Sequence, residues 1–208
     1  DDSDTTPDVS IDMEDVSEMQ EIELETLPEE CFRACGALKE ANLPEGLTAI
    51  GANAFYDCFS LPNPEMPTTL VTVGPGAFTG CDSFTEITFH EGLITLSRYA
   101  FDHCDKLQKV NLPDTVIDIG ERAFKDCVSM TSFDYPMGWA NVPRISSSYN
   151  VFQNCQSLKE ITIPEGVTAT PVGAFAGSAF IEKVNLPSTL LNLGDFAFHG
   201  CVALSEIE

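Results

Sequence analysis

The chain repeats one pattern every 23 residues along most of its length. Successive repeats are 23 residues apart, except for one step of 28 residues. A constant period in this range is typical of a solenoid, in which each repeat forms one coil and stacks on its neighbours. The repeat therefore predicts a single continuous core shared by all coils. Its marker is a Phe preceded by a small residue, at Phe32, Phe55, Phe78, Phe101, Phe124, Phe152, Phe175 and Phe198.

Other positions recur in phase with this Phe. A Cys follows it by three residues in seven of the eight repeats, and Ser178 replaces the Cys in the remaining one. Further along each repeat, apolar and polar residues alternate, as at Val184 and Leu186. This period of two predicts a short strand with one face inward, and the constant pitch stacks such strands in parallel. A Pro such as Pro187 ends most of these strands at the same level, because it has no backbone N–H.

The combined pattern, A-F-x-x-C-x-x-L-x-x-I-x-I-P-x-x-V-x-x-I-G, resembles the BspA-like leucine-rich repeat of bacterial surface proteins. The resemblance covers about residues 24–208. It implies an α/β-type solenoid, a right-handed arc or horseshoe with a parallel concave β-sheet and an irregular or short helical convex side. It also implies binding or adhesion rather than catalysis, although family membership does not identify the ligand.

Two regions are expected along the chain. Residues 1–20 are acidic and poor in apolar side chains, which predicts a solvated, flexible leader. The leader lacks the spacing of a calcium-binding loop. Residues 21–208 are expected to form the solenoid, with a partial first coil, seven units and a truncated eighth. The fifth unit carries five extra residues within 136–150.

Charge and motifs exclude several functions. The chain has 33 acidic and 10 basic residues, a formal charge of −23, which is the wrong sign for binding nucleic acid or an anionic membrane surface. No apolar run is long enough to span a bilayer. The sequence has no G-x-S-x-G, H-E-x-x-H or phosphate-loop motif, and His90, His103 and His199 occupy loop or variable positions. We therefore expect neither an enzyme nor a cofactor.

The eight cysteines suggest a disulfide or metal framework at first sight. Seven of them, however, occupy the same position of the repeat, and closely paired C-x-x-C motifs are absent. This pattern favours buried free thiols that fill the core as small apolar side chains, and no metal site is expected. A disulfide between neighbouring coils remains an alternative.

The outward positions of the strands are the first candidate partner-binding surface. They are polar, mostly acidic and almost without aromatics, which favours a protein or extracellular-matrix ligand and includes basic ligands among the candidates. The alternative is an ordinary solvated sheet face. The candidate residues are Glu40, Glu65, Glu86, Lys109, Asp134, Glu160 and Lys183.

The insertion in the fifth unit is the second candidate. It contains the only Trp, and insertions in solenoids form loops that often carry recognition. Trp139, Arg144 and Tyr149 are residue types favoured at protein interfaces. The alternative is that Trp139 fills the core where other units have Leu or Val, with Tyr149 covering it.

These features predict a non-catalytic adhesion or protein-binding module, located outside the cell or on its surface, without membrane insertion. A structural stalk for another domain and an intracellular interaction scaffold are the alternatives. The sequence ends just inside a strand around Ile207. An open strand edge can pair with another chain, so self-association through this end is a further expectation.

Overall fold

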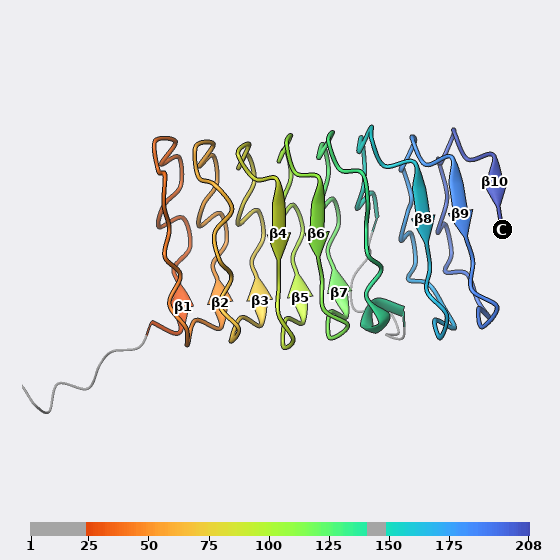
Figure 1. Cartoon of the computed structure of the whole chain (residues 1–208), viewed down its shortest axis with the longest axis horizontal. Coiled ribbons are helices and arrows are strands. Elements are labelled where there is room, and N and C mark those ends of the chain that lie inside the picture. Colours follow the sequence, from red (N-terminus) through yellow and green to blue (C-terminus); the bar gives the residue numbers. More distant parts are fainter. Residues whose placement is uncertain (1–23, 141–148) are drawn as a thin grey trace, which may run out of the picture.

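The computed structural model describes residues 24–140 and 149–208, and the predicted leader at 1–20 lies outside the described residues. The coils lie side by side in a row that is close to straight in the view of Figure 1. Each coil corresponds to one repeat, and the strands pair in parallel with their partners one repeat away, as Glu86 does with Lys109. The solenoid predicted from the 23-residue period is therefore confirmed.

The coils carry strands at two levels. The predicted alternating segment forms a two-stranded sheet of β4 (Glu86–Thr88) and β6 (Lys109–Asn111), and a three-stranded sheet of β8 (Glu160–Thr162), β9 (Lys183–Asn185) and β10 (Glu206–Ile207). A second, five-stranded parallel sheet consists of β1 (Thr26–Leu27), β2 (Ala49–Ile50), β3 (Thr72–Val73), β5 (Thr95–Leu96) and β7 (Asp118–Ile119). Figure 1 shows the five-stranded sheet along the lower part of the row and the strands of the other two sheets above it.

The five-stranded sheet was not expected from the sequence. Its strands are only two residues long, so no period-two alternation marks them. A Gly follows β2, β3 and β7, and the backbones of neighbouring coils approach closely at these positions. At Gly51 an added Cβ atom would lie 2.6 Å from the carbonyl oxygen of Leu27 in the preceding coil, and the Gly51 N–H donates to this same oxygen at 2.8 Å. The Gly thus permits the close approach that forms the sheet.

The third side of each coil is a series of turns around the Phe. The backbone N–H groups of Asn53, Phe55 and Asp57 each donate to a carbonyl of the next coil at 2.8 Å. The residues between them donate instead to the carbonyl three positions earlier in their own coil, at 3.1 Å or slightly more. Asn53 and Asp57 have φ values of 53° and 57°, and the corresponding positions of the other coils also have positive φ. Left-handed residues interrupt an α-helix, so this side consists of turns.

This geometry corrects the predicted fold class. In the described part of the chain the only helix is a short 3-10 helix, η2 (Met137–Ala140), so the molecule is a β-solenoid rather than an α/β solenoid. Of the two expectations for the convex side, the irregular one agrees with these turns. On the turn side, the two left-handed residues of every coil interrupt any α-helix.

The eight repeat-marking Phe side chains form one continuous column. Neighbouring rings are stacked with centroids 5.2–6.0 Å apart and interplanar angles of at most 16°. The six inner rings are fully buried, while Phe32 and Phe198 at the ends are partly exposed. A single shared core is therefore confirmed, and the five extra residues of the fifth unit leave the column intact.

A second column consists of the cysteines, which are all free thiols. In six coils the Cys Sγ donates to the carbonyl oxygen of the column Phe in the preceding coil, at 3.0–3.3 Å. Burial raises the pKa of these thiols, as it raises that of Cys58 to about 11. The shorter side chain of Ser178 leaves its buried hydroxyl without a hydrogen-bond partner. A Cys at this position therefore both fills space and links two coils.

Truncation of one ring tests the Phe column. Phe101→Ala should lower the free energy of unfolding by about 3–5 kcal/mol, because it leaves a cavity between two stacked rings. Phe59→Ala is the matched control, since Phe59 lies outside the column and is 55% exposed, and it should cost about 0.5 kcal/mol or less. Denaturant unfolding measures both, and equal losses would contradict the role of the column.

Thiol reactivity tests the Cys column. In the native protein a thiol reagent should react rapidly with the exposed Cys31 and Cys35. The buried cysteines should react only after unfolding, because burial excludes the reagent and disfavours the thiolate. Cys31→Ser with Cys35→Ser should remove the rapid phase. A denatured chain that exposes fewer than eight reactive thiols would reveal a disulfide.

Candidate functional site

The strands β4, β6, β8, β9 and β10, with the corresponding segments of the other coils, present one surface that we call the long-strand face. It carries seven of the residues that the sequence singled out, all exposed or half-buried and at one of two outward positions, eight or ten residues after the column Phe: Glu40, Glu65, Glu86, Lys109, Asp134, Glu160 and Lys183. The structure thus brings these seven predicted candidates onto one surface. Whether they bind a partner stays a prediction.

Several side chains of this face form hydrogen bonds with one another. Asn111 Nδ2 donates to Glu86 Oε1 at 2.8 Å and to Thr88 Oγ1 at 2.9 Å. Asn185 repeats this arrangement with Glu160 and Thr162, at 2.6 and 2.9 Å. In both places an acid and a hydroxyl on one strand are joined by an amide on the next strand.

A lysine completes each of these groups. Lys109 Nζ lies 2.9 Å from Asp134 Oδ2, and Lys183 Nζ lies 2.9 Å from Glu208 Oε2. The hydrogen bond from each lysine to its carboxylate raises the pKa of that lysine. We call the groups the first polar set (Glu86, Thr88, Lys109, Asn111, Asp134) and the second polar set (Glu160, Thr162, Lys183, Asn185, Glu208). They have the same geometry and lie three coils apart.

The long-strand face is interrupted near its N-terminal end. The segment that should form a strand in the second coil contains Pro62 and Pro64 and belongs to no sheet. Two adjoining hollows of about 300 and 600 Å³ lie over this segment. Glu40 lines the smaller hollow, Glu86 lines the larger one, and Glu65 lines both. Three of the predicted acids therefore line these two adjoining hollows.

Two other acids of this face have a structural role. Both Glu45 carboxylate oxygens accept from the Thr68 N–H at 3.1 Å, and Glu45 Oε2 also accepts from the Thr68 hydroxyl at 2.8 Å. Glu165 binds Ser188 one repeat later in the same way. These hydrogen bonds lower the pKa of Glu45 and of Glu165. The two glutamates therefore link successive coils.

The two described aromatic residues of the insertion differ in burial. Trp139 lies on η2 and is only 1% exposed, with its ring 5.9 Å from those of Phe133 and Phe175. This burial favours the core interpretation of Trp139. Arg144 lies outside the described residues. Tyr149 is half-buried and packs over Gly173, with its ring 6.4 Å from that of Phe196.

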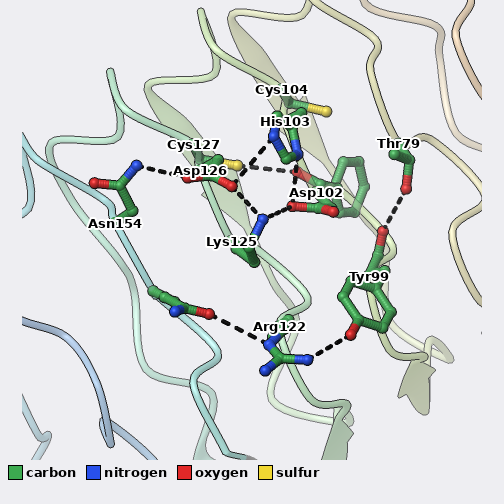
Figure 2. A network of polar contacts seen from close by, with 12 residues as sticks. Thr79, Tyr99, Asp102, His103, Cys104, Arg122, Lys125, Asp126, Cys127 and Asn154 are labelled. Carbon is green, nitrogen blue, oxygen red and sulfur yellow. Dashed lines mark hydrogen bonds and ion pairs between the residues drawn. The ribbon is translucent and has the colours of Figure 1, made fainter.

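A polar cluster on the turn side was not expected from the sequence (Figure 2). Lys125 Nζ forms ion pairs with Asp102, at 3.3 Å, and with Asp126. His103 lies between the same carboxylates, with Nδ1 2.9 Å from Asp102 and Nε2 3.3 Å from Asp126. Burial acts to raise the pKa of Asp126, but hydrogen bonds from Lys125 and Asn154 outweigh it and hold the pKa below its ordinary value.

The cluster has donor atoms that could hold a metal ion, on Asp102, His103 and Asp126. The ammonium of Lys125, however, already pairs with both carboxylates and neutralises part of their charge. The arrangement therefore joins two neighbouring coils by ion pairs and a third by the hydrogen bond from Asn154 to Asp126, rather than forming an open coordination site. Its signal in the sequence is that these polar residues fall one or two positions after the column Phe in successive repeats.

The last coil exposes apolar side chains. Leu191 is 85% exposed and Val202 is 84% exposed, and Phe196 and Ile207 are also largely exposed. In the structure no further coil covers them. Self-association through this end remains a prediction.

The comparisons with known proteins agree with this architecture. The BspA type leucine rich repeat region matches residues 25–149 and 129–208, with six copies. The chain belongs to the BspA-type leucine-rich repeat family. No curated protein matches this BspA-type chain in sequence. Among the described residues, no helix has the length and apolar character needed to cross a membrane.

Three solved structures share the BspA-type fold. A leucine-rich repeat protein from Bacteroides ovatus is 25% identical with a TM-score of 0.62, and the match covers 88% of this chain and 52% of that one. The leucine-rich repeat protein of T. pallidum is 30% identical with a TM-score of 0.54, covering 76% and 68%. The pneumococcal vaccine antigen PcpA is 22% identical with a TM-score of 0.57, covering 88% and 48%. The chain thus spans about half the length of the Bacteroides ovatus protein.

Removal of the shared cation tests the turn-side cluster. Lys125→Met should lower the free energy of unfolding by about 1–3 kcal/mol at neutral pH, because two half-buried aspartates lose a charged donor. The folded pKa of Asp126 lies below its ordinary value of 3.8, so the stabilisation is present above that pH and is lost as the pH falls further. The deficit should therefore shrink in acid. Lys106→Met, at an exposed site, is the control.

Proposed function

We propose that the chain is a non-catalytic protein-interaction module of a bacterial surface protein, and that it binds its partner through the long-strand face. The single observation that carries this proposal is the pair of polar sets. In each set, charged and amide side chains are held in place by hydrogen bonds before any partner arrives. Side chains that are already ordered lose less entropy on binding.

The chemistry of the face favours recognition by charge and hydrogen bonds. Acids outnumber lysines on it, and the aromatic rings near it are mostly buried. Such a surface steers oppositely charged partners toward it and provides selectivity more than raw affinity. A protein or matrix ligand with exposed basic groups is the partner class that fits best.

The surface location is part of the proposal. It is supported by membership of the BspA-type family and by the likeness of the fold to the pneumococcal vaccine antigen PcpA. An adhesion role is a narrower form of the same proposal. A stalk that only positions another domain would need the stacked core but no ordered polar sets.

Charge reversal on the face tests the function. Glu86→Arg with Glu160→Arg changes one acid in each polar set, and capture of extracellular proteins by the immobilised chain should fall by about tenfold or more, a loss of about 1.4 kcal/mol. Glu29→Arg with Asp105→Arg is the control, because it changes the net charge equally at exposed sites outside the polar sets. Quantitative mass spectrometry of the captured proteins is the measurement. Equal losses in both variants, or no capture by the wild-type chain, would favour the stalk.

A further inference from the structure

The two polar sets are copies of one arrangement. Glu86 and Glu160 both lie eight residues after a column Phe. Asn111 and Asn185 make the same two hydrogen bonds, to the acid and to the hydroxyl of the preceding strand. Equivalent residues of the two sets are three coils apart. The long-strand face therefore presents the same group of polar atoms twice.

The core fixes the distance between the two sets. The column rings of the four coils concerned, Phe78, Phe101, Phe124 and Phe152, are buried and stacked on one another. Their centroids are separated by successive steps of 5.3, 5.6 and 5.7 Å. The row of coils is close to straight in Figure 1, so these three steps place equivalent atoms of the two sets about 17 Å apart. Two identical groups are thus held at one separation.

Each set keeps oxygen atoms available to a partner. The Asn amide of each set donates to Oε1 of the glutamate, and among the described residues Oε2 of Glu86 and Oε2 of Glu160 accept no hydrogen bond. Both glutamates are exposed. The second acid of each set, Asp134 or Glu208, pairs with its lysine through one carboxylate oxygen, and its side chain is 61% or 66% exposed. The outward oxygens of both sets are therefore accessible.

The charge of each set selects a basic group. The hydrogen bond to a carboxylate raises the pKa of Lys109 and of Lys183, so both lysines are charged at neutral pH. Two carboxylates and one ammonium leave each set with one excess negative charge. A guanidinium or ammonium group neutralises this charge, and a guanidinium can donate to two oxygens at once. Each set therefore fits one basic side chain.

We propose that the two polar sets act together and bind two basic side chains of a single protein partner, about 17 Å apart. The inference rests on the proposed function and adds the spacing of the groups that the partner presents. Once the first basic group is bound, the second is held near its own set, so the joint affinity exceeds that of either contact alone. A partner with the same charge but another spacing engages one set at a time.

The first two coils provide an internal control. Glu40 occupies the same position of the repeat as Glu86 and Glu160. Its carboxylate accepts from Asn42 of its own coil, at 3.1 Å, rather than from an Asn of the next coil. The second coil has Asn63 where each polar set has its lysine. Glu40 therefore reports the effect of an acid on this face outside a polar set.

The test uses two labelled helical peptides as rulers for the wild-type chain. Each is an Ala-rich helix of about 20 residues that carries two pairs of adjacent Arg. In the long ruler the pairs are eleven residues apart, which is three turns and about 17 Å. In the short ruler they are seven residues apart, which is two turns and about 10 Å. Both rulers have the same composition and charge, and each presents both pairs on one face.

Fluorescence anisotropy measures the affinities. We expect the long ruler to bind at least about tenfold more tightly than the short ruler. A third peptide with one Arg pair should bind no more tightly than the short ruler. Equal affinities of the two rulers, or no binding of the long ruler, would overturn the inference. This comparison needs only the wild-type protein, so it does not depend on the folding of any variant.

Single substitutions assign the spacing to the two sets. Glu86→Gln or Glu160→Gln alone should weaken the long ruler about tenfold, because one of its two contacts is lost. Either variant should leave the short ruler within about twofold, since the short ruler can still use the other set. Glu40→Gln is the matched control and should leave both rulers within about twofold. Equal weakening of the long ruler by Glu40→Gln would overturn the assignment to the polar sets.

The outcome also separates this inference from the proposed function. A wild-type chain that captures extracellular proteins through the long-strand face but does not prefer the long ruler would overturn the inference and leave the function standing. A chain that neither captures proteins nor binds either ruler would overturn both.

Discussion

The structure depends on the turns that enclose each column Phe. In six of the coils the backbone N–H groups around this ring alternate between their own turn and the next coil, and the rings of the column stack at 5.2–6.0 Å. This double attachment sets the pitch of the whole row. The longer fifth unit shows how strict the constraint is. Phe124 N still donates to Val151 O at 3.0 Å, and the Phe124 and Phe152 rings stay stacked at 5.7 Å despite the extra residues.

Because the turns and the five-stranded sheet hold the coils together, the long-strand face can vary. Pro62 and Pro64 interrupt its ladder in the second coil, while the neighbouring β2 and β3 remain paired. A fold with one sheet would lose its continuity at such a point. Here the interruption removes ladder hydrogen bonds on one side of β4, while Asn63 of the second coil still bonds to Thr85 at 2.8 Å.

The polar side chains have two different tasks. On the turn side, Asp102, Lys125 and Asp126 pair with one another and join coils. On the long-strand face, Asn111 and Asn185 hold acids at the surface, where they remain accessible to a partner. The distinction follows from burial, since partly buried charges need partners within the protein whereas exposed ones are satisfied by water.

The sequence alone determined the coil, the Phe column, the parallel pairing of the alternating segments in five of the eight coils, and the surface that carries the seven polar candidates. It did so because a constant period places equivalent residues next to one another in space. Only the tertiary structure decided which side chains are available. Trp139 is buried and Lys125 stands between two aspartates. The backbone groups of Glu86 have no partner strand on one side. Those outcomes depend on distances between neighbouring coils, which a one-dimensional pattern does not contain.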